Sequence, residues 1–314
     1  MTPVFPTTIP HGRTARRLEW PHLPPGVRTL IEQHCGSSVI EARSQGGGFT
    51  PGFASVLICE DGSRHFVKAA STVAQRAFAD SYREEARKVQ ALPDTVPAPR
   101  LLWVEDGDWV VLELEYVEAR APKRPWQADE LELCLDAVER LADELTPVPD
   151  GLDLDPVTSE LAEWPALWEA VPDRAARPHA DEAAALAATY AEVAVGETVV
   201  HTDLRDDNVL LTEDGRALFC DWNWPVAGAD WLDSLILLIS PRGDGVDVEK
   251  VIAERRLLRQ VPPEHVDRVL ALLAGYLLSR GAEPSPANSP HVRDAQRWQG
   301  EVVWDWLGER RGWR

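Results

Sequence analysis

Strand-like patterns in this sequence are concentrated in one block, residues 38–115. Short apolar runs alternate there with turn signals, among them the triplet Gly46-Gly47-Gly48 and the pair Asp61-Gly62. One stretch of the block, residues 72–92, has its apolar positions at helical spacing instead. We therefore predict a five-stranded antiparallel sheet with one helix. The strands are expected at residues 39–43, 53–59, 64–70, 101–105 and 109–115.

The rest of the chain is mostly helical in pattern. A β run at residues 198–201 and a hairpin over residues 209–221 interrupt it. Residues 1–24 are rich in proline and have no periodicity, and 314 residues are enough for two cores. We predict an α+β chain with an N-terminal arm (1–24), a sheet lobe (25–117) and a helical lobe (118–314). Helices are expected near residues 26–34, 127–145, 157–169, 178–194, 229–239, 247–258, 263–279 and 288–309.

The charge and the cysteines exclude several classes of protein. A formal charge of −20 at pH 7 argues against binding a nucleic-acid backbone or an anionic membrane, because both attract clustered Lys and Arg. No run of roughly 18 apolar residues occurs, and the N-terminus has no secretory signal pattern. The cysteines are far apart, without a C-x-x-C pair. We expect a cytoplasmic protein with reduced thiols, no nucleic-acid partner and no membrane association, and leave the oligomeric state open.

The segment His201-Thr202-Asp203-Leu204-Arg205-Asp206-Asp207-Asn208 has the spacing H-x-D-x-x-x-x-N. Phosphoryl transfer requires a carboxylate that orients the attacking hydroxyl, and oxygen ligands for a metal ion that bridges the phosphates. Asp203 is the candidate base, and Asn208 is a candidate metal ligand. Asp221 ends the second hairpin strand, which returns it to the neighbourhood of Asn208, so it is the second candidate ligand. Two oxygen ligands of this kind suit Mg²⁺.

Lys68 ends the third expected strand, where protein kinases place the lysine that pairs with the α and β phosphates. Its orienting partner is expected on the following helix at Glu85, with Glu84 as the alternative, and only one of the two can face Lys68. The triplet Gly46-Gly47-Gly48 lies between the first two strands, where backbone amides can approach phosphates. Each feature alone is common. Their order along the chain predicts a nucleotide site in the sheet lobe.

These residues resemble the aminoglycoside phosphotransferase and choline kinase-like family. The resemblance rests on the loop from His201 to Leu210 and on Asp221-Trp222, because a Trp commonly follows the metal aspartate in that family. It implies a two-lobed protein-kinase-like fold, ATP or GTP with Mg²⁺, and phosphorylation of a hydroxyl on a small molecule. It also implies that adenine hydrogen-bonds to the backbone of the segment that contains Glu115 and Val117, which are therefore candidate nucleotide contacts.

The resemblance leaves the acceptor open. An aminoglycoside-like antibiotic or a cationic amino-sugar metabolite is the leading expectation, and the first would make this an antibiotic-resistance enzyme; choline, homoserine and sugars are alternatives. A nucleotide-binding pseudokinase acting through a partner protein is a second class, but the intact Lys68, Asp203, Asn208 and Asp221 argue against it. A protein kinase is disfavoured, because the chain has no D-F-G or A-P-E motif and has Thr202 where those enzymes have Arg.

We assign the catalytic loop and the substrate pocket to the helical lobe. Two further residues are expected to support the loop. His201 is expected to pack against or hydrogen-bond to the loop backbone without transferring protons. The resemblance suggests that Asp233 braces the loop. The acceptor pocket is expected within residues 157–192 and the C-terminal helices. Its candidate cation-binding acids are Glu160, Glu163, Glu169, Asp181, Glu182, Asp294, Glu301 and Asp305.

Overall fold

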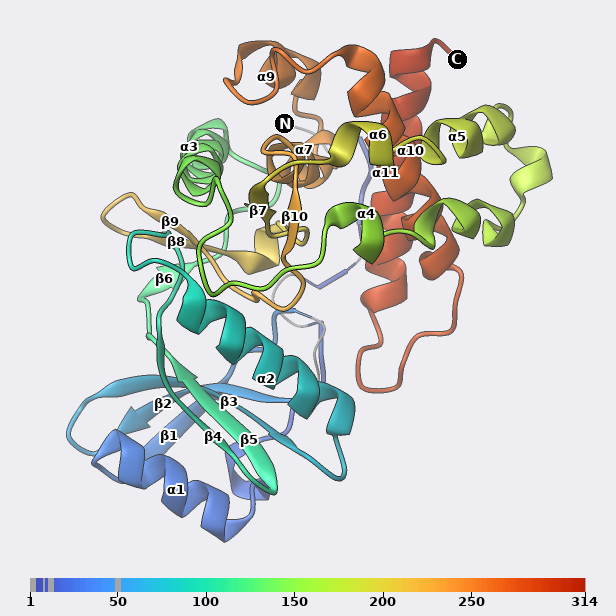
Figure 1. Cartoon of the computed structure of the whole chain (residues 1–314). Helices are drawn as coiled ribbons and strands as arrows, with labels where there is room; N and C mark the ends of the chain where they lie inside the picture. The colour runs from blue at the N-terminus through green and yellow to red at the C-terminus, as the bar shows by residue number, and fades with distance from the viewer. Residues whose placement is uncertain (1–3, 8, 11–13, 49–51, 314) are drawn as a thin grey trace.

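The computed structural model describes residues 4–7, 9–10, 14–48 and 52–313 of the chain. A smaller lobe is built on a sheet, and a larger lobe is mostly helical (Figure 1). The sheet has five antiparallel strands in the order β1-β2-β3-β5-β4. The expected two-lobed α+β fold is therefore confirmed. The strands are β1 (Val39–Ser44), β2 (Phe53–Cys59), β3 (Arg64–Ser71), β4 (Leu101–Asp106) and β5 (Trp109–Leu114).

The two faces of the sheet have different surroundings, because successive side chains of a strand point to opposite sides. Val67 and Ala69 of β3 are fully buried in one core with α1 (Pro25–Cys35). Lys68, between them in sequence, lines a large cavity on the opposite face, where α2 (Arg76–Ala91) packs on β3. The strand alternation therefore turns Lys68 toward the helical lobe.

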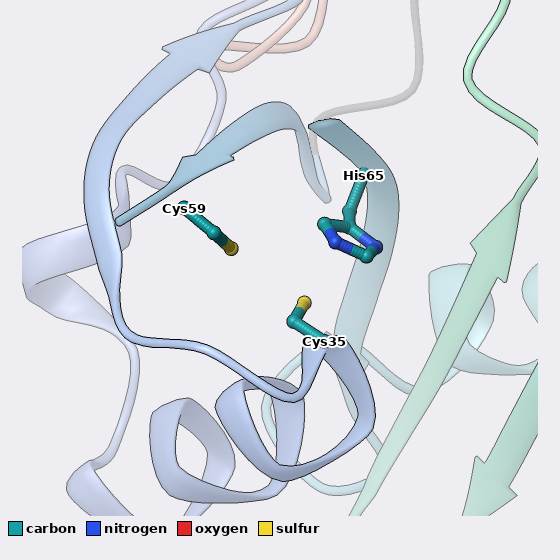
Figure 2. A group of neighbouring side chains, drawn as sticks. All are labelled: Cys35, Cys59 and His65. Carbon is teal, nitrogen blue, oxygen red and sulfur yellow. The ribbon is translucent and has the colours of Figure 1, made fainter. Parts of the chain in front are cut away.

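Two of the cysteines meet a histidine between α1 and the sheet (Figure 2). Ligand atoms of Cys35, Cys59 and His65 lie within 4.8 Å of one another, although no sequence motif pairs them. Burial raises the pKa of the Cys35 thiol to about 12, so it stays protonated at neutral pH. The ring nitrogens of His65 have partners of their own, 2.7 Å from Glu113 Oε1 and 2.9 Å from Ser63 Oγ. Cys35 is thus a neutral core group and not a thiolate.

Three long helices frame the larger lobe: α3 (Ala128–Glu144), α10 (Pro263–Gly281) and α11 (Val292–Arg311). Helices α10 and α11 pack closely against each other (Figure 1). A Cβ atom at Gly281 would stand 2.6 Å from the backbone N of Arg297. Glycine at this position therefore allows the close approach of the two helices.

Two small sheets hold the predicted catalytic loop. In one, β7 (Thr198–Val200) pairs with β10 (Val226–Gly228). In the other, β8 (Val209–Thr212) pairs with both β9 (Ala217–Phe219) and β6 (Ala119–Arg120). Strands β6 and β10 have no counterpart among the expected elements. Because β7 ends just before residue 201 and β8 begins just after residue 208, the loop is anchored at both ends.

Several expected helices are wrong in extent, for local reasons. Residues 157–169 form α4 (Val157–Glu160) and then a 3₁₀ helix (Trp164–Ala170), in which Pro165 lacks the N–H that an α-helix needs. Residues 178–194 divide into α5 (Ala180–Ala187) and α6 (Ala191–Ala194), and the Thr189 hydroxyl donates to the Leu186 carbonyl in the gap. The helices expected at residues 229–239 and 247–258 are shorter than predicted, as α7 (Leu232–Leu237) and α9 (Val248–Glu254), and α8 (Ile239–Gly243) extends beyond the expected helices.

The described part of the N-terminal arm contains a 3₁₀ turn, η1 (Trp20–His22), and contacts both lobes. The division of the chain after residues 24 and 117 stays our proposal. In the described part of the chain, no helix combines the length and the apolar character needed to cross a membrane.

Candidate active site

Lys68 lies at the centre of a buried group of charges between the lobes. Its Nζ donates to both carboxylate oxygens of Glu85, at 2.7 and 2.9 Å, and to Asp221 Oδ1 at 2.5 Å. Glu84, the alternative partner, instead faces Arg87 at 2.9 Å. Burial would lower the pKa of Lys68, but Asp221 and Glu85 outweigh it and hold the pKa well above its usual range. The lysine therefore stays charged at every physiological pH.

Asp233 holds the loop 201–208 from behind. Its carboxylate oxygens accept from the N–H groups of His201, at 2.7 Å, and Thr202, at 3.0 Å. His201 is buried; its Nε2 donates to the Cys220 carbonyl at 3.0 Å, and its Nδ1 accepts from the N–H of Asp203 at 3.3 Å. Burial lowers the pKa of His201, which favours the neutral ring that this pattern requires. Both side chains therefore bind backbone groups of the loop.

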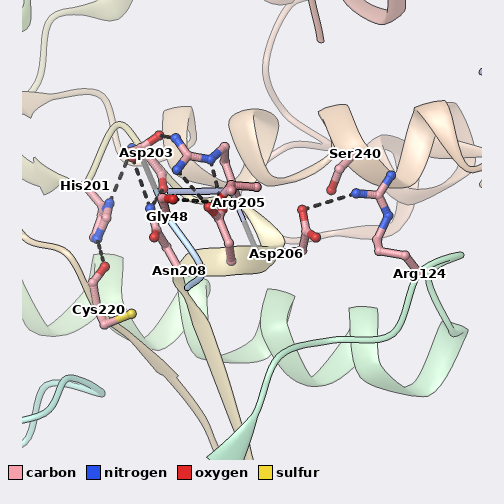
Figure 3. A network of polar contacts seen from close by, with 12 residues as sticks. Gly48, Arg124, His201, Asp203, Arg205, Asp206, Asn208, Cys220 and Ser240 are labelled. Atoms are coloured by element: carbon pink, nitrogen blue, oxygen red, sulfur yellow. Dashed lines mark hydrogen bonds and ion pairs between the residues drawn. The ribbon is translucent and has the colours of Figure 1, made fainter. Parts of the chain in front are cut away.

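Asp203 projects from this loop beside Asn208 and Arg205 (Figure 3). Its Oδ2 accepts from Asn208 Nδ2 at 3.0 Å, and its Oδ1 accepts from Arg205 Nη1. Asn208 Nδ2 also donates to the Asp203 carbonyl at 2.8 Å, so the amide nitrogen is turned toward Asp203 and the amide oxygen away from it. Burial raises the pKa of Asp203 to about 6, although the charge of Arg205 opposes this rise.

A cavity of about 620 Å³ lies between the lobes. Lys68, Asp221 and apolar side chains such as Val56 and Leu114 form part of its wall. Among the described residues that line it, six side chains are basic and four are acidic, although the whole chain has a formal charge of −20. The wall therefore combines basic groups with apolar side chains, which suits a nucleotide. The basic residues are Arg17, Arg43, Lys68, Arg120, Arg124 and Arg205.

The predicted phosphate loop borders this cavity. Gly46, Gly47 and Gly48 line it, whereas residues 49–51 of the same loop lie outside the described residues. Gly48 has a φ of +74°, which favours glycine, and a Cβ there would stand 3.4 Å from Arg17 Nη2. The triplet therefore brings bare backbone to the cavity wall.

The predicted adenine segment also borders the cavity, through Glu115 and Val117. The N–H of Glu115 donates to the Arg100 carbonyl at 2.7 Å, so this N–H is already used. The Glu115 side chain accepts from Arg100 Nε at 3.1 Å and does not carry a separate charge toward a ligand. On these two residues, the carbonyl of Glu115 and the backbone N–H and carbonyl of Val117 can therefore bind a base.

A second, smaller cavity of about 120 Å³ lies beside Asp203. The rings of Trp164 and Tyr276, stacked with centroids 3.7 Å apart, form part of its wall. Asp203 is the sole carboxylate among the described residues that line it, and 33% of its side-chain surface is exposed. Arg205 and Gln299 line both cavities. The two cavities therefore share a wall beside the predicted base.

None of the five arginines in the described wall of the larger cavity had a role assigned from the sequence, and three of them contact the catalytic loop or the glycine triplet. Arg205 donates from Nε to Asp207 Oδ1 at 2.9 Å, in addition to its contact with Asp203. Arg124 donates from Nη1 to Asp206 at 3.2 Å (Figure 3). Arg17 donates from Nη2 to a carbonyl of the glycine triplet at 2.6 Å. The motif itself points to Arg205, but Arg124 and Arg17 are far from the loop in sequence, so no local pattern indicates them.

A model of the phosphotransferase enzyme family matches residues 53–224 of this sequence. The match covers more than half of the chain and includes Lys68, Glu85, Asp203, Asn208 and Asp221. The chain belongs to the phosphotransferase enzyme family. The glycine triplet precedes the matched region and Asp233 follows it, so their roles rest on geometry. No match to the sequence is found among curated proteins.

Solved structures of small-molecule kinases share the fold. Spectinomycin phosphotransferase, in complex with ADP and spectinomycin, is 11% identical with a TM-score of 0.66, over 92% of this chain and 99% of that chain. Choline kinase LicA from Streptococcus pneumoniae is 11% identical with a TM-score of 0.58, over 89% and 99%. An aminoglycoside phosphotransferase from Alicyclobacillus acidocaldarius is 17% identical with a TM-score of 0.58, over 92% and 96%. At these identities the likeness shows the fold alone.

Proposed function

We propose that this phosphotransferase moves the γ-phosphoryl group of ATP to a hydroxyl of a small molecule. The position of Asp203 supports this most directly. Asp203 lines the smaller cavity, Lys68 and Asp221 line the larger one, and Arg205 lines both. A nucleotide in the larger cavity and an acceptor in the smaller one would bring their reacting groups together at Asp203 and Arg205. The intact set of charges also disfavours a nucleotide-binding protein without catalysis.

The larger cavity is the proposed nucleotide site. Adenine lies against its apolar walls, with the Glu115 carbonyl and the Val117 N–H as hydrogen-bonding groups. The phosphates lie between the glycine triplet and Lys68. Glu85 and Asp221 keep that lysine charged and in place, which is the positioning that phosphoryl transfer depends on.

The residues present fit Mg²⁺. Asp221 offers a carboxylate, and Asn208 offers the amide oxygen that is turned away from Asp203. The N–H of Cys220 donates to the Asn208 backbone carbonyl at 3.0 Å, which keeps Asp221 and Asn208 in one neighbourhood. Hard oxygen donors and few protein ligands suit Mg²⁺ when phosphates complete its shell. Bound here, the ion would offset negative charge on the phosphate oxygens.

Asp203 is the proposed general base. It accepts the hydroxyl proton as the acceptor oxygen bonds to the γ-phosphorus, and the bond from that phosphorus to the β–γ bridging oxygen breaks to release ADP. Arg205 supplies positive charge beside the transferred group, and its contacts with Asp203 and Asp207 fix its guanidinium. Asp233 keeps the loop backbone in position through its two N–H contacts.

Activity is expected to fall as the pH drops below about 6. Burial raises the pKa of Asp203 to about 6, and a base must be deprotonated to accept a proton. The carboxylate is therefore competent above this pH, and below it log kcat/KM should approach a slope of about one per pH unit. A pH–rate profile, with circular dichroism to show that the fold persists, checks this. A flat profile through this range would contradict the assignment.

The smaller cavity favours an acceptor with one apolar or aromatic ring. Its walls include seven aliphatic side chains and the stacked pair Trp164 and Tyr276. The other polar side chains in its described lining are those of Thr202, Asp203, Arg205, Ser240, Gln296 and Gln299. Its volume of about 120 Å³ is close to the ~150 Å³ of an apolar cavity that binds benzene, so it suits a single six-membered ring.

The acids considered for a cationic acceptor lie elsewhere. None of the eight belongs to the described lining of either cavity. Several face arginines instead: Glu301 faces Arg177, Asp181 faces Arg174 and Glu182 faces Arg311. Among the described residues that line the smaller cavity, Asp203 is the one carboxylate that the amines of an aminoglycoside or amino sugar would find. We therefore place a neutral hydroxyl compound of one-ring size ahead of the cationic acceptors expected from the sequence.

A screen of ATP consumption tests both parts of this proposal. Purified protein is assayed for ADP formation with neutral ring alcohols, aminoglycosides, choline, homoserine and sugars, and Asp203→Asn is the matched control. Stimulation by a neutral ring alcohol, lost in the variant, is expected. Stimulation by aminoglycosides alone would overturn the acceptor class and keep the reaction. Tight ATP binding without stimulation by any hydroxyl compound would favour the pseudokinase.

A further inference from the structure

Described parts of the N-terminal arm line the larger cavity and contact both lobes. The dark blue trace of the arm begins beside the helical lobe and passes to the sheet lobe (Figure 1). The N–H of Phe5 donates to the Gly243 carbonyl at 3.0 Å, and the N–H of Thr14 donates to the Gly46 carbonyl at 2.8 Å. The arm is therefore tied to both lobes by backbone hydrogen bonds. Its described residues in the cavity wall are Thr7, Ile9, Pro10, Thr14 and Arg17.

The arm places a guanidinium group beside the proposed metal carboxylate. Arg17 Nη2 donates to the Gly47 carbonyl at 2.6 Å, and the Thr14 hydroxyl donates to the Gly48 carbonyl at 2.5 Å. A Cβ at Gly48 would stand 3.4 Å from Arg17 Nη2 and 3.6 Å from Asp221 Oδ2. The guanidinium and the carboxylate therefore flank the same glycine of the phosphate loop.

The charges around Lys68 favour a further cation, in addition to Arg205, if a polyphosphate is to bind. Lys68 already contacts two carboxylates, Glu85 and Asp221, so these three side chains together carry a net negative charge. A nucleoside triphosphate with one Mg²⁺ brings about two more negative charges. Arg17 adds a positive charge at this point, and a planar guanidinium presents several N–H donors that match phosphate oxygens.

We propose that Arg17 binds the β- and γ-phosphates of the nucleotide, with Thr14 fixing the arm to the glycine triplet. The inference rests on the proposed function and extends the nucleotide site to a residue outside the region 53–224 that the family model matches. The N-terminal arm then contributes a phosphate-binding residue to the nucleotide site.

Calorimetry on the full-length chain tests this inference with Arg17→Ala and, as the matched control, Arg16→Ala. Arg16 is an exposed neighbour whose backbone N–H donates to the Asn288 carbonyl at 2.9 Å. Hydrogen bonds to charged groups contribute enough that Mg·ATP and Mg·ADP should bind about 10- to 100-fold more weakly to Arg17→Ala. AMP, which has no β- or γ-phosphate, should bind as it does to the unchanged chain.

The other outcomes are decisive too. Unchanged affinity for Mg·ATP, or an equal loss for AMP, would overturn a β,γ-phosphate contact. Tighter binding would show that Arg17 obstructs the site. If Arg17→Ala fails to fold, Arg17→Lys replaces it, because lysine keeps the positive charge but lacks the planar set of guanidinium N–H donors. Affinity of Arg17→Lys for Mg·ATP equal to that of the unchanged chain would overturn the guanidinium contact. Failure of the unchanged chain to bind any ATP would instead count against the proposed function.

Discussion

Asp203→Asn is expected to lower kcat by about 10²- to 10⁴-fold, the usual contribution of a positioned general base. The amide keeps the size of the carboxylate but cannot accept the hydroxyl proton. Affinity for Mg·ATP should stay nearly unchanged, because Asp203 belongs to the wall of the smaller cavity and not to the described wall of the larger one. The variant therefore separates catalysis from nucleotide binding.

The measurement is ADP formation with the acceptor found by the screen, together with calorimetry of Mg·ATP. Asp207→Asn is the matched control, because Asp207 is the other carboxylate that contacts Arg205. A base at Asp203 predicts a much smaller loss of kcat in the control. Equal losses would mean that both changes act through the position of Arg205. Unchanged turnover in Asp203→Asn would remove Asp203 from the role of base.

The sheet lobe was predictable because its signals are local. Turn residues such as Asp61-Gly62 separate short runs, and the alternation of β3 fixes which side chains share a face. Lys68 follows from that alternation. The choice of Glu85 over Glu84 needed only the direction of a helical side chain, since neighbouring helical residues point about 100° apart.

The helical lobe and the arm were less predictable because their structure depends on distant contacts. Helical periodicity extends through residues 157–169 and again through residues 178–194, but a proline in the first stretch and a threonine side chain in the second break the helices. Arg17 reaches the glycine triplet from a segment without periodicity. Cys35 and Cys59 meet only because α1 packs on the sheet. Contacts between residues far apart in the chain follow no fixed sequence spacing, so one sequence cannot predict them and the three-dimensional structure is needed.

Asp221→Asn is expected to remove the Mg²⁺-dependent part of nucleotide affinity. Asp221 has a φ of +65°, which asparagine tolerates far better than alanine, so this variant keeps the backbone while it removes the charge. Loss of a ligand should weaken Mg·ATP binding by at least about tenfold, the scale of loss known even for residues behind the ligands. In this variant Lys68 keeps its ion pair with Glu85, so we expect the sheet lobe to stay folded. Asp221→Ala should lose the same affinity with added backbone strain.

The decisive comparison is calorimetry of ATP with Mg²⁺ and with a chelator. Without the metal, Asp221→Asn should bind ATP no more weakly than the unchanged chain, because the substitution removes a negative charge that faces the phosphates. Asp206→Asn is the matched control, since Asp206 lines the same cavity but pairs with Arg124. It should retain the gain in affinity that Mg²⁺ provides. Undiminished Mg·ATP affinity in Asp221→Asn would exclude Asp221 as a ligand, and equal losses in both variants would show that the loss is not specific to a metal ligand at Asp221.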